Sequence, residues 1–135
     1  RLLQAVWAHL NQAMGPGIGM PASLAELKGQ HAALFTGFDK VPAQITASVT
    51  TDEGRAMRAS LNPLREQAFL AIAAELAPAA DPVRQRRLAA VIQLLHSAYA
   101  WDSLREQWGM DGAEAGEATL WAIEAIAQSL KETKP

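Results

Sequence analysis

The sequence of 135 residues contains no cysteine, and only 6% of its residues are aromatic. Without thiols the chain can form no disulfide framework, no thiolate metal site and no cysteine nucleophile. It also lacks an apolar run of the ~20 residues that a membrane-spanning helix requires, and its first residues do not follow the plan of a signal peptide. We therefore expect a soluble, cytoplasmic protein without a membrane partner.

An excess of charge is also missing, because 12 basic and 14 acidic residues give a formal net charge of −2. Affinity for nucleic acid comes mainly from lysine and arginine side chains that neutralise phosphates. The one basic cluster consists of Arg84, Arg86 and Arg87, and it is typical of a solvated helix face. This sequence by itself is therefore not expected to bind DNA.

Half of the residues are hydrophobic, and a chain of this length can bury a core without metal or disulfide support. Residues 1–135 are expected to form a single all-α domain of six or seven helices, because the apolar residues recur at helical spacing between breaks rich in glycine and proline. The predicted helices run to about residue 14, then over about 24–38, 43–49, 51–61, 63–76, 82–108 and 112–131.

The predicted helix starts carry residues that accept hydrogen bonds from the free N–H groups of a first helical turn. They are Ser23 with Glu26, Thr50 with Glu53, Asn62 with Pro63, Asp81 with Pro82, and Asp111 with Glu114. Gly109 is typical of a helix end, because glycine adopts the left-handed conformation found there.

The last two predicted helices carry more apolar surface than packing inside one chain requires. A helix on the side of its own domain needs one apolar stripe, whereas each of these has two, and Trp121 falls within the narrow polar strip of the last. A second copy of the same two helices, related by a twofold axis, could cover the excess, although a tightly enclosed pair within a monomer is the alternative. The candidate interface residues are Trp101, Leu104, Trp108, Gly116, Leu120, Trp121, Ile123 and Ala127.

The segment RRLAAVIQLLHSAYAWDSLREQWGMDGAEAGEATLWAIEAI, residues 86–126, resembles the C-terminal region of TetR-family transcriptional regulators. Two motifs carry the resemblance: W-x-x-L-R-x-x-x-G-[LM] on a long helix, and E-A-x-x-A-x-x-W-A-I on the last one. The segment TTDEGRAMRASLNPLREQAFLAIAAELAP is similar to the middle helices of that family. The matching positions are Trp101, Leu104, Arg105, Gly109, Met110, Glu117, Ala118, Trp121, Ala122 and Ile123.

The resemblance implies a homodimer in which the last two helices, residues 81–131, form an intersubunit four-helix bundle. It also implies that residues 1–80 enclose a pocket for a small apolar or amphipathic effector. The DNA-binding domain of that family is an N-terminal helix-turn-helix, which this sequence lacks. Its opening, RLLQAVWAHLNQAM, is in helical period from the first residue, so we expect DNA binding only through a domain that is absent here.

Ligand pockets in such domains are mostly apolar with a few placed polar groups. His31 interrupts an apolar stripe, and three interpretations stay open: a core histidine bonded to a backbone carbonyl, a pocket wall, or a metal ligand. The candidate pocket residues are Trp7, Leu10, Met14, Met20, His31, Leu34, Phe35, Phe38, Phe69 and Ile72.

No residue pattern indicates an enzyme, a metal site or a cofactor. His96 and Ser97 are neighbours in the predicted long helix and so point in different directions, with His96 on the polar strip. No two histidines have metal-ligand spacing, and GPGIG follows a helix rather than a strand, so it does not match a dinucleotide-binding motif. A free-standing interaction domain that uses an exposed tryptophan surface is the alternative to the regulator domain.

Overall fold

The computed structural model describes residues 19–132, and this part of the chain is entirely helical, without any strand. The predicted all-α class is therefore confirmed. The candidate residues Trp7, Leu10 and Met14 lie outside the described residues. The seven helices described are α2 (Leu24–Phe38), α3 (Pro42–Thr50), α4 (Asp52–Ala59), α5 (Asn62–Leu76), α6 (Pro82–Leu95), α7 (Ala98–Trp108) and α8 (Gly112–Glu132).

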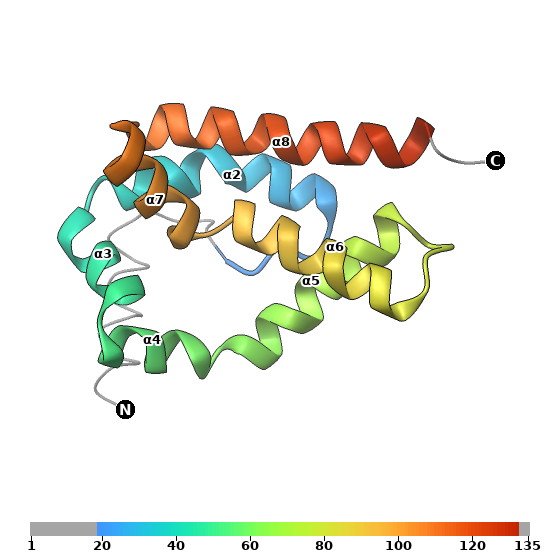
Figure 1. The fold of residues 1–135 in the computed structure, drawn as a ribbon, viewed down its shortest axis with the longest axis horizontal. Coiled ribbons are helices and arrows are strands. Elements are labelled where there is room, and N and C mark those ends of the chain that lie inside the picture. The colour runs from blue at the N-terminus through green and yellow to red at the C-terminus, as the bar shows by residue number, and fades with distance from the viewer. Residues whose placement is uncertain (1–18, 133–135) are drawn as a thin grey trace.

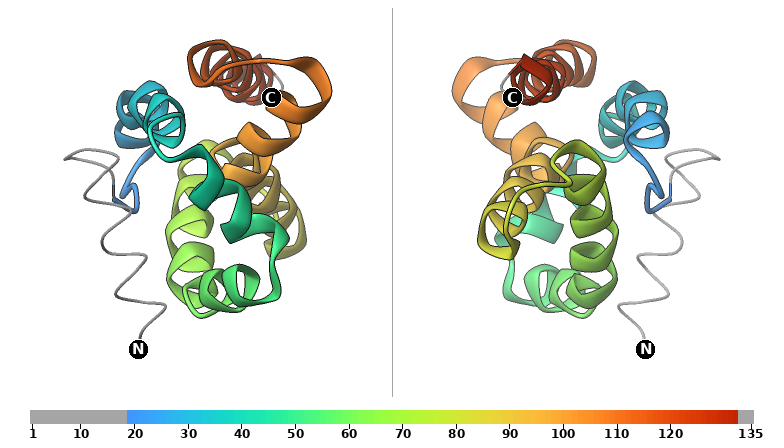
Figure 2. Two further views of the ribbon diagram at one scale, coloured as in Figure 1. Left: turned by 90° about the vertical axis from the view of Figure 1, so that its left-hand side faces the viewer. Right: turned by 90° about the vertical axis from the view of Figure 1, so that its right-hand side faces the viewer.

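The most extensive helix packing is that of α2 against α8 and of α5 against α6 (Figure 1). Helices α2 and α8 run side by side along one side of the molecule, and α5 and α6 form a second pair below them. At one end, α3 and α4 connect the two pairs, and α7 packs against α3 and α8 (Figure 2). None of the described helices is long and apolar enough to cross a membrane.

Three of the predicted N-caps are confirmed by hydrogen bonds from the first turn of a helix. Ser23 Oγ accepts from the Glu26 N–H at 3.1 Å, and Asp81 and Asp111 accept in the same way at 2.9 Å each. Gly109 ends α7 with a φ of 66°, as predicted. Local sequence therefore determines where these helices begin and end.

Two predicted caps were wrong by one residue. Thr51, not Thr50, caps α4, and its hydroxyl accepts from the Gly54 N–H at 3.0 Å. At the start of α5 the cap residue is Leu61, which has no capping side chain, and Asn62 instead accepts a hydrogen bond from Arg65.

The predicted helix over 82–108 was wrong, because the structure contains two helices there. His96 leaves the helical conformation at φ −107° and ψ 51°. The hydroxyl of Ser97 then accepts from the Ala100 N–H at 3.4 Å and donates to the Leu94 carbonyl at 2.7 Å. The break turns His96 into the protein interior, where only 8% of its surface is exposed, so its predicted position on a polar strip was also wrong.

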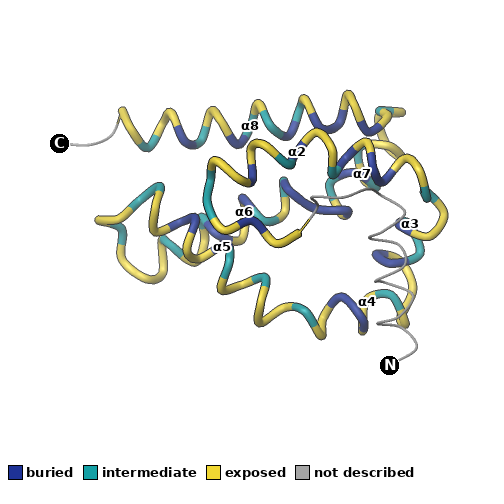
Figure 3. The backbone as a smooth tube through the Cα atoms, turned by 180° about the vertical axis from the view of Figure 1, so that it is seen from behind, coloured by how far each residue is buried: buried dark blue, intermediate teal, exposed yellow. Residues whose placement is uncertain are grey.

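The core consists of two clusters of buried residues, and Figure 3 marks the buried positions along the backbone in dark blue. The first cluster lies where α2, α3, α7 and the start of α8 meet, and the second lies between α2, α5, α6 and α8. Their largest members are Phe35, Phe38, Ile45 and Trp101 in the first cluster, and Leu27, Phe69, Ile72, Ile92 and Ile123 in the second.

Trp101 belongs to the core of the chain, and its predicted place in a subunit interface was wrong. Its side chain is fully buried, and its indole Nε1 donates to the Asp39 carboxylate at 2.9 Å. The second oxygen of Asp39 accepts from the Gly112 N–H at 2.7 Å. Asp39 thereby joins the end of α2 to α7 and to the start of α8, so Trp101 has no surface left for a partner.

Three further interface candidates are also buried within the chain. Ile123 is in the second core cluster, Ala127 is 9% exposed, and a Cβ on Gly116 would lie 3.2 Å from Phe35 Cβ. Leu104 and Leu120 are half-buried, whereas Trp108 and Trp121 are exposed. Part of the predicted interface is thus covered within the chain, where α7 packs against α3 and α2 packs against α8.

Candidate ligand-binding site

Two histidines and a threonine form a buried hydrogen-bonded chain between three parts of the fold. His31 comes from α2, His96 from the break between α6 and α7, and Thr119 from α8. The Nδ1 atoms of the two histidines lie 2.8 Å apart, and His31 Nε2 lies 2.6 Å from Thr119 Oγ1. His31 is therefore a hydrogen-bonded core residue, whose partners are the side chains of His96 and Thr119 and, as one interpretation of the sequence expected, the backbone, here that of Gly116.

The hydrogen-bond network assigns the proton positions in this chain. The Thr119 hydroxyl donates to the Ala115 carbonyl at 2.8 Å, so its oxygen is left to accept from His31 Nε2–H. His31 Nδ1 then has no proton and accepts from His96 Nδ1–H. The remaining nitrogen of His96, Nε2, is an acceptor that neither His31 nor Thr119 uses.

Both histidines are neutral at neutral pH. Burial lowers the pKa of His31 to about 4, although a backbone hydrogen bond with Gly116 works in the opposite direction. Burial, and then the nearby His31, lower the pKa of His96 to about 3. An uncharged pair is consistent with a core position, because an ionised group there would lose its hydration.

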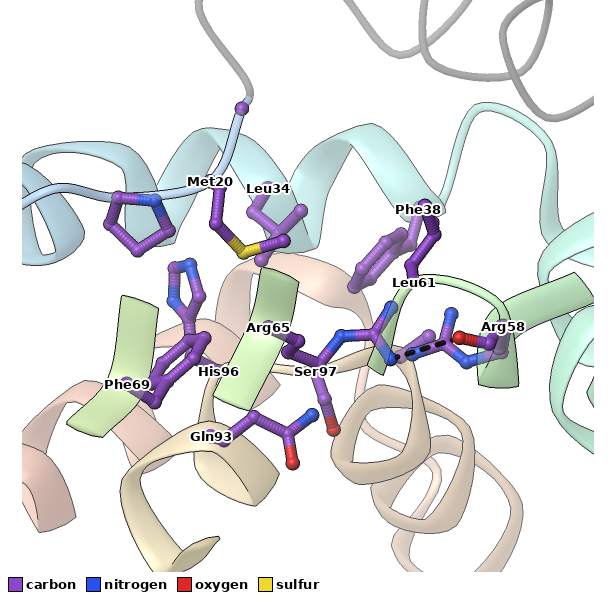
Figure 4. Close-up of a pocket in the computed structure, with 13 residues that line it drawn as sticks. Met20, Leu34, Phe38, Arg58, Leu61, Arg65, Phe69, Gln93, His96 and Ser97 are labelled. Carbon is purple, nitrogen blue, oxygen red and sulfur yellow. Dashed lines mark hydrogen bonds between the residues drawn. The ribbon is translucent and has the colours of Figure 1, made fainter. Parts of the chain in front are cut away.

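The ring of His96 also forms part of the wall of a hollow, which Figure 4 shows in close-up. This hollow has a volume of about 160 Å³ and lies between the segment before α2 and helices α2, α4, α5 and α6. Apolar side chains and a polar group of two arginines, one glutamine and His96 share its wall. The described residues whose side chains are labelled there are Met20, Leu34, Phe38, Arg58, Leu61, Arg65, Phe69, Gln93, His96 and Ser97.

Two further hollows, of about 300 and 610 Å³, share part of this wall. Arg65 and Gln93 line all three, and Arg58 lines the first and the third. Among the described residues that line them, the carboxylates consist of Glu66 alone, whereas the arginines are Arg55, Arg58, Arg65 and Arg86. The three hollows thus meet at a strongly basic point.

The two arginines at this point are close to each other and partly removed from water. Arg65 Nη1 donates to the backbone carbonyl of Arg58 at 3.3 Å and to Asn62 Oδ1 at 2.9 Å. Arg58 is 6% exposed, and its guanidinium carbon lies 5.1 Å from the centre of the Tyr99 ring. Burial lowers the pKa of both arginines, and the charge of Arg65 lowers that of Arg58 further.

The structure brings four of the described pocket candidates together and leaves three in the core. Met20, Leu34, Phe38 and Phe69 line the first hollow, whereas His31, Phe35 and Ile72 are fully buried and line none of the three. Whether the four bind a ligand stays a prediction.

Sequence reasoning missed every charged or polar residue of this wall. Arg58 and Arg65 belong to different helices, and their shared hollow depends on the angle between α4 and α5, which no local pattern encodes. His96 was missed because the predicted helix continued through it. The one available signal was Ser97, whose side chain can cap a helix that starts at Ala98.

Comparisons of the chain with protein-family models, curated proteins and solved structures give no match. Within residues 19–132, no three histidine or carboxylate side chains lie close enough together to hold a metal ion. The Ser97 hydroxyl donates to the Leu94 carbonyl, which is a capping role.

Proposed function

We propose that this chain is the effector-sensing and dimerisation domain of a TetR-like transcriptional regulator. In this proposal a small amphipathic molecule occupies the hollow beside His96, and DNA is bound by a helix-turn-helix domain of the whole regulator. The observation that carries the proposal is the composition of the hollow. Its apolar wall with a few polar groups at one side is the usual character of a small-molecule site.

The histidine chain supports a route from this hollow to α8. His96 lines the hollow, and His31 joins it to Thr119 at the middle of α8. An effector that contacts His96 in one state of the dimer and not in another would favour that state by its difference in affinity. A shift of α8 against α2 is the motion that this connection would transmit.

The outer face of α8 supports the dimerisation part of the proposal. Buried residues lie on its inner side and exposed residues follow its outer side (Figure 3). Trp121 on this helix is 72% exposed, and Trp108 at the end of α7 is 73% exposed. Tryptophan is enriched in protein interfaces, so the proposed partner of this face is a second copy of the chain.

Sedimentation velocity at micromolar concentration tests the dimer. We expect the unchanged chain to sediment as a dimer and Trp121→Glu to sediment as a soluble monomer, because the new carboxylate would have to be buried in the interface. Since Trp121 is exposed in the single chain, its replacement should change the free energy of unfolding by less than about 0.5 kcal/mol.

The matched control is Leu64→Glu on α5, where an apolar side chain that is 61% exposed lies outside α7 and α8. This variant should remain dimeric. A monomeric unchanged chain would contradict the regulator proposal and would favour the second candidate, a helical interaction domain that presents Trp108 and Trp121 to a different protein. An unchanged dimer in Trp121→Glu would place the interface on another face.

A further inference from the structure

We infer that the hollow beside His96 binds an organic carboxylate, with the anionic group at Arg58 and Arg65 and the apolar body against Met20, Leu34 and Phe38. This inference rests on the proposed function, because it names the chemical class of the effector. The proposed function leaves the charge of the effector open, whereas this inference requires a negative charge. A neutral effector would contradict it.

The wall of the hollow is rich in positive charge. Four arginines and one glutamate line the three adjoining hollows in the described part of the chain. The molecule as a whole is slightly acidic, with a formal net charge of −2. The basic character is therefore local to this wall, and a negatively charged ligand would be attracted to it.

The two central arginines of this wall lie next to each other. The hydrogen bond from Arg65 Nη1 to the Arg58 carbonyl, at 3.3 Å, brings the two residues together. Burial disfavours the charged form of both arginines, and the charge of Arg65 disfavours that of Arg58 further. A carboxylate between them would reduce this repulsion and would offset part of the hydration that burial removes. The planar guanidinium matches the two oxygens of a carboxylate.

The first hollow also has an apolar part of its wall. Leu34 and Phe38 come from successive turns of α2, and Met20 lies just before that helix. In the view of Figure 4 these three side chains lie above Arg65, and Gln93 lies below it. Met20 is 43% exposed, so a flexible side chain stands at the edge of the hollow and can adapt to a hydrocarbon body. The wall thus has an apolar part and a basic part, which match the hydrocarbon body and the carboxylate of a fatty or aromatic acid.

Isothermal titration calorimetry with straight-chain carboxylates tests the inference. Octanoate, decanoate and dodecanoate would be compared with the alcohols of the same length, and acetate would serve as an anion without an apolar body. We expect at least one carboxylate to bind about tenfold or more tightly than its alcohol, because hydrogen bonds to charged groups are the stronger ones. Acetate should not bind measurably.

Two variants test the position of the anionic group. Arg65→Gln removes one cation and should weaken carboxylate binding about tenfold, while binding of the alcohol stays the same. Gln93→Glu places an internal carboxylate on the wall that Arg65 shares, so it should also weaken carboxylate binding. This second variant is expected to melt at a higher temperature than the unchanged chain, which separates loss of binding from loss of folding.

The matched control is Arg87→Gln, since Arg87 is exposed on α6 and lines none of the three hollows. It should bind the carboxylate as the unchanged chain does. Equal affinity for carboxylate and alcohol, with no effect of Arg65→Gln, would overturn the inference and leave the sensing function standing. If neither series bound, both the inference and the pocket part of the proposed function would be rejected, whereas sedimentation would still decide the dimer.

Discussion

The structure holds polar side chains in its interior at two adjacent places, and their chemistry is opposite. The chain of His31, His96 and Thr119 is neutral, and hydrogen bonds within the protein satisfy it. Arg58 and Arg65 carry permanent charge and face a hollow. The comparison teaches that uncharged polar groups can be part of the core once they pair with each other, whereas charged groups at the wall of a hollow keep an electric field that can attract a ligand of opposite charge. His96 belongs to both places.

The largest expected difference between the two places is in their response to pH. In the unfolded chain each histidine has a pKa near 6.5, whereas in the folded chain the values are about 4 and about 3. Well above pH 6.5 both histidines are neutral in the folded and in the unfolded chain, so their titration does not change the free energy of unfolding. As the pH falls below 6.5 the unfolded chain binds protons first, so the folded state loses stability.

Between pH 7 and pH 5 this loss should amount to about 2 kcal/mol for each histidine, measured by urea denaturation. The arginines remain charged throughout this range and should contribute nothing. The control is the double variant His31→Leu with His96→Leu, which should lose most of the pH dependence. An equally steep dependence in that variant would locate the titrating groups elsewhere.

The next largest effect is expected from breaking the histidine chain at neutral pH. His31→Leu replaces the imidazole on α2 by an apolar side chain of similar size. His96 Nδ1–H then has no acceptor. The free energy of unfolding should fall by about 2–4 kcal/mol, as measured by chemical denaturation.

The double variant provides the comparison for this prediction as well, because it removes both partners. It should be destabilised by less than the sum of the two single variants, since neither orphaned nitrogen remains. Additive losses would show that the two rings contribute by packing alone.

The smallest effect on stability is expected at the other place. Arg65→Gln in the absence of ligand should change the free energy of unfolding by less than about 1 kcal/mol, because Arg65 is only half-buried and Asn62, one of its two hydrogen-bond partners, is exposed. Thermal denaturation of this variant beside His31→Leu measures the comparison directly. A loss as large as that of His31→Leu would make Arg65 a structural residue rather than part of a binding wall.

The residue pairs that were predicted correctly are those close together in the chain. Ser23 with Glu26 and Asp111 with Glu114 were recognisable because a cap and its first turn are covered by four residues. The continuous helix through His96 failed for a related reason. Its local pattern is compatible with a helix, and a hydrogen bond to His31, 65 positions away in sequence, favours the break.

The two tryptophans of WDSLREQW show the same division. Their spacing of seven residues places them on one stripe of a helix, but Trp101 is fully buried and Trp108 is 73% exposed. Asp39 and Phe38 at the end of α2 contact Trp101. The spacing of the two tryptophans does not indicate that α2 buries one of them and leaves the other exposed.

The sequence by itself determined the helical class, most helix ends and the apolar residues that form the core, because capping and periodicity act over a few neighbouring residues. Only the tertiary structure decided that His31 meets His96, that Arg58 and Arg65 share one hollow, and that Trp101 faces inward. Each of these depends on the angle between helices that are distant in the chain. Those angles result from the packing of all the side chains together, and no single segment contains them.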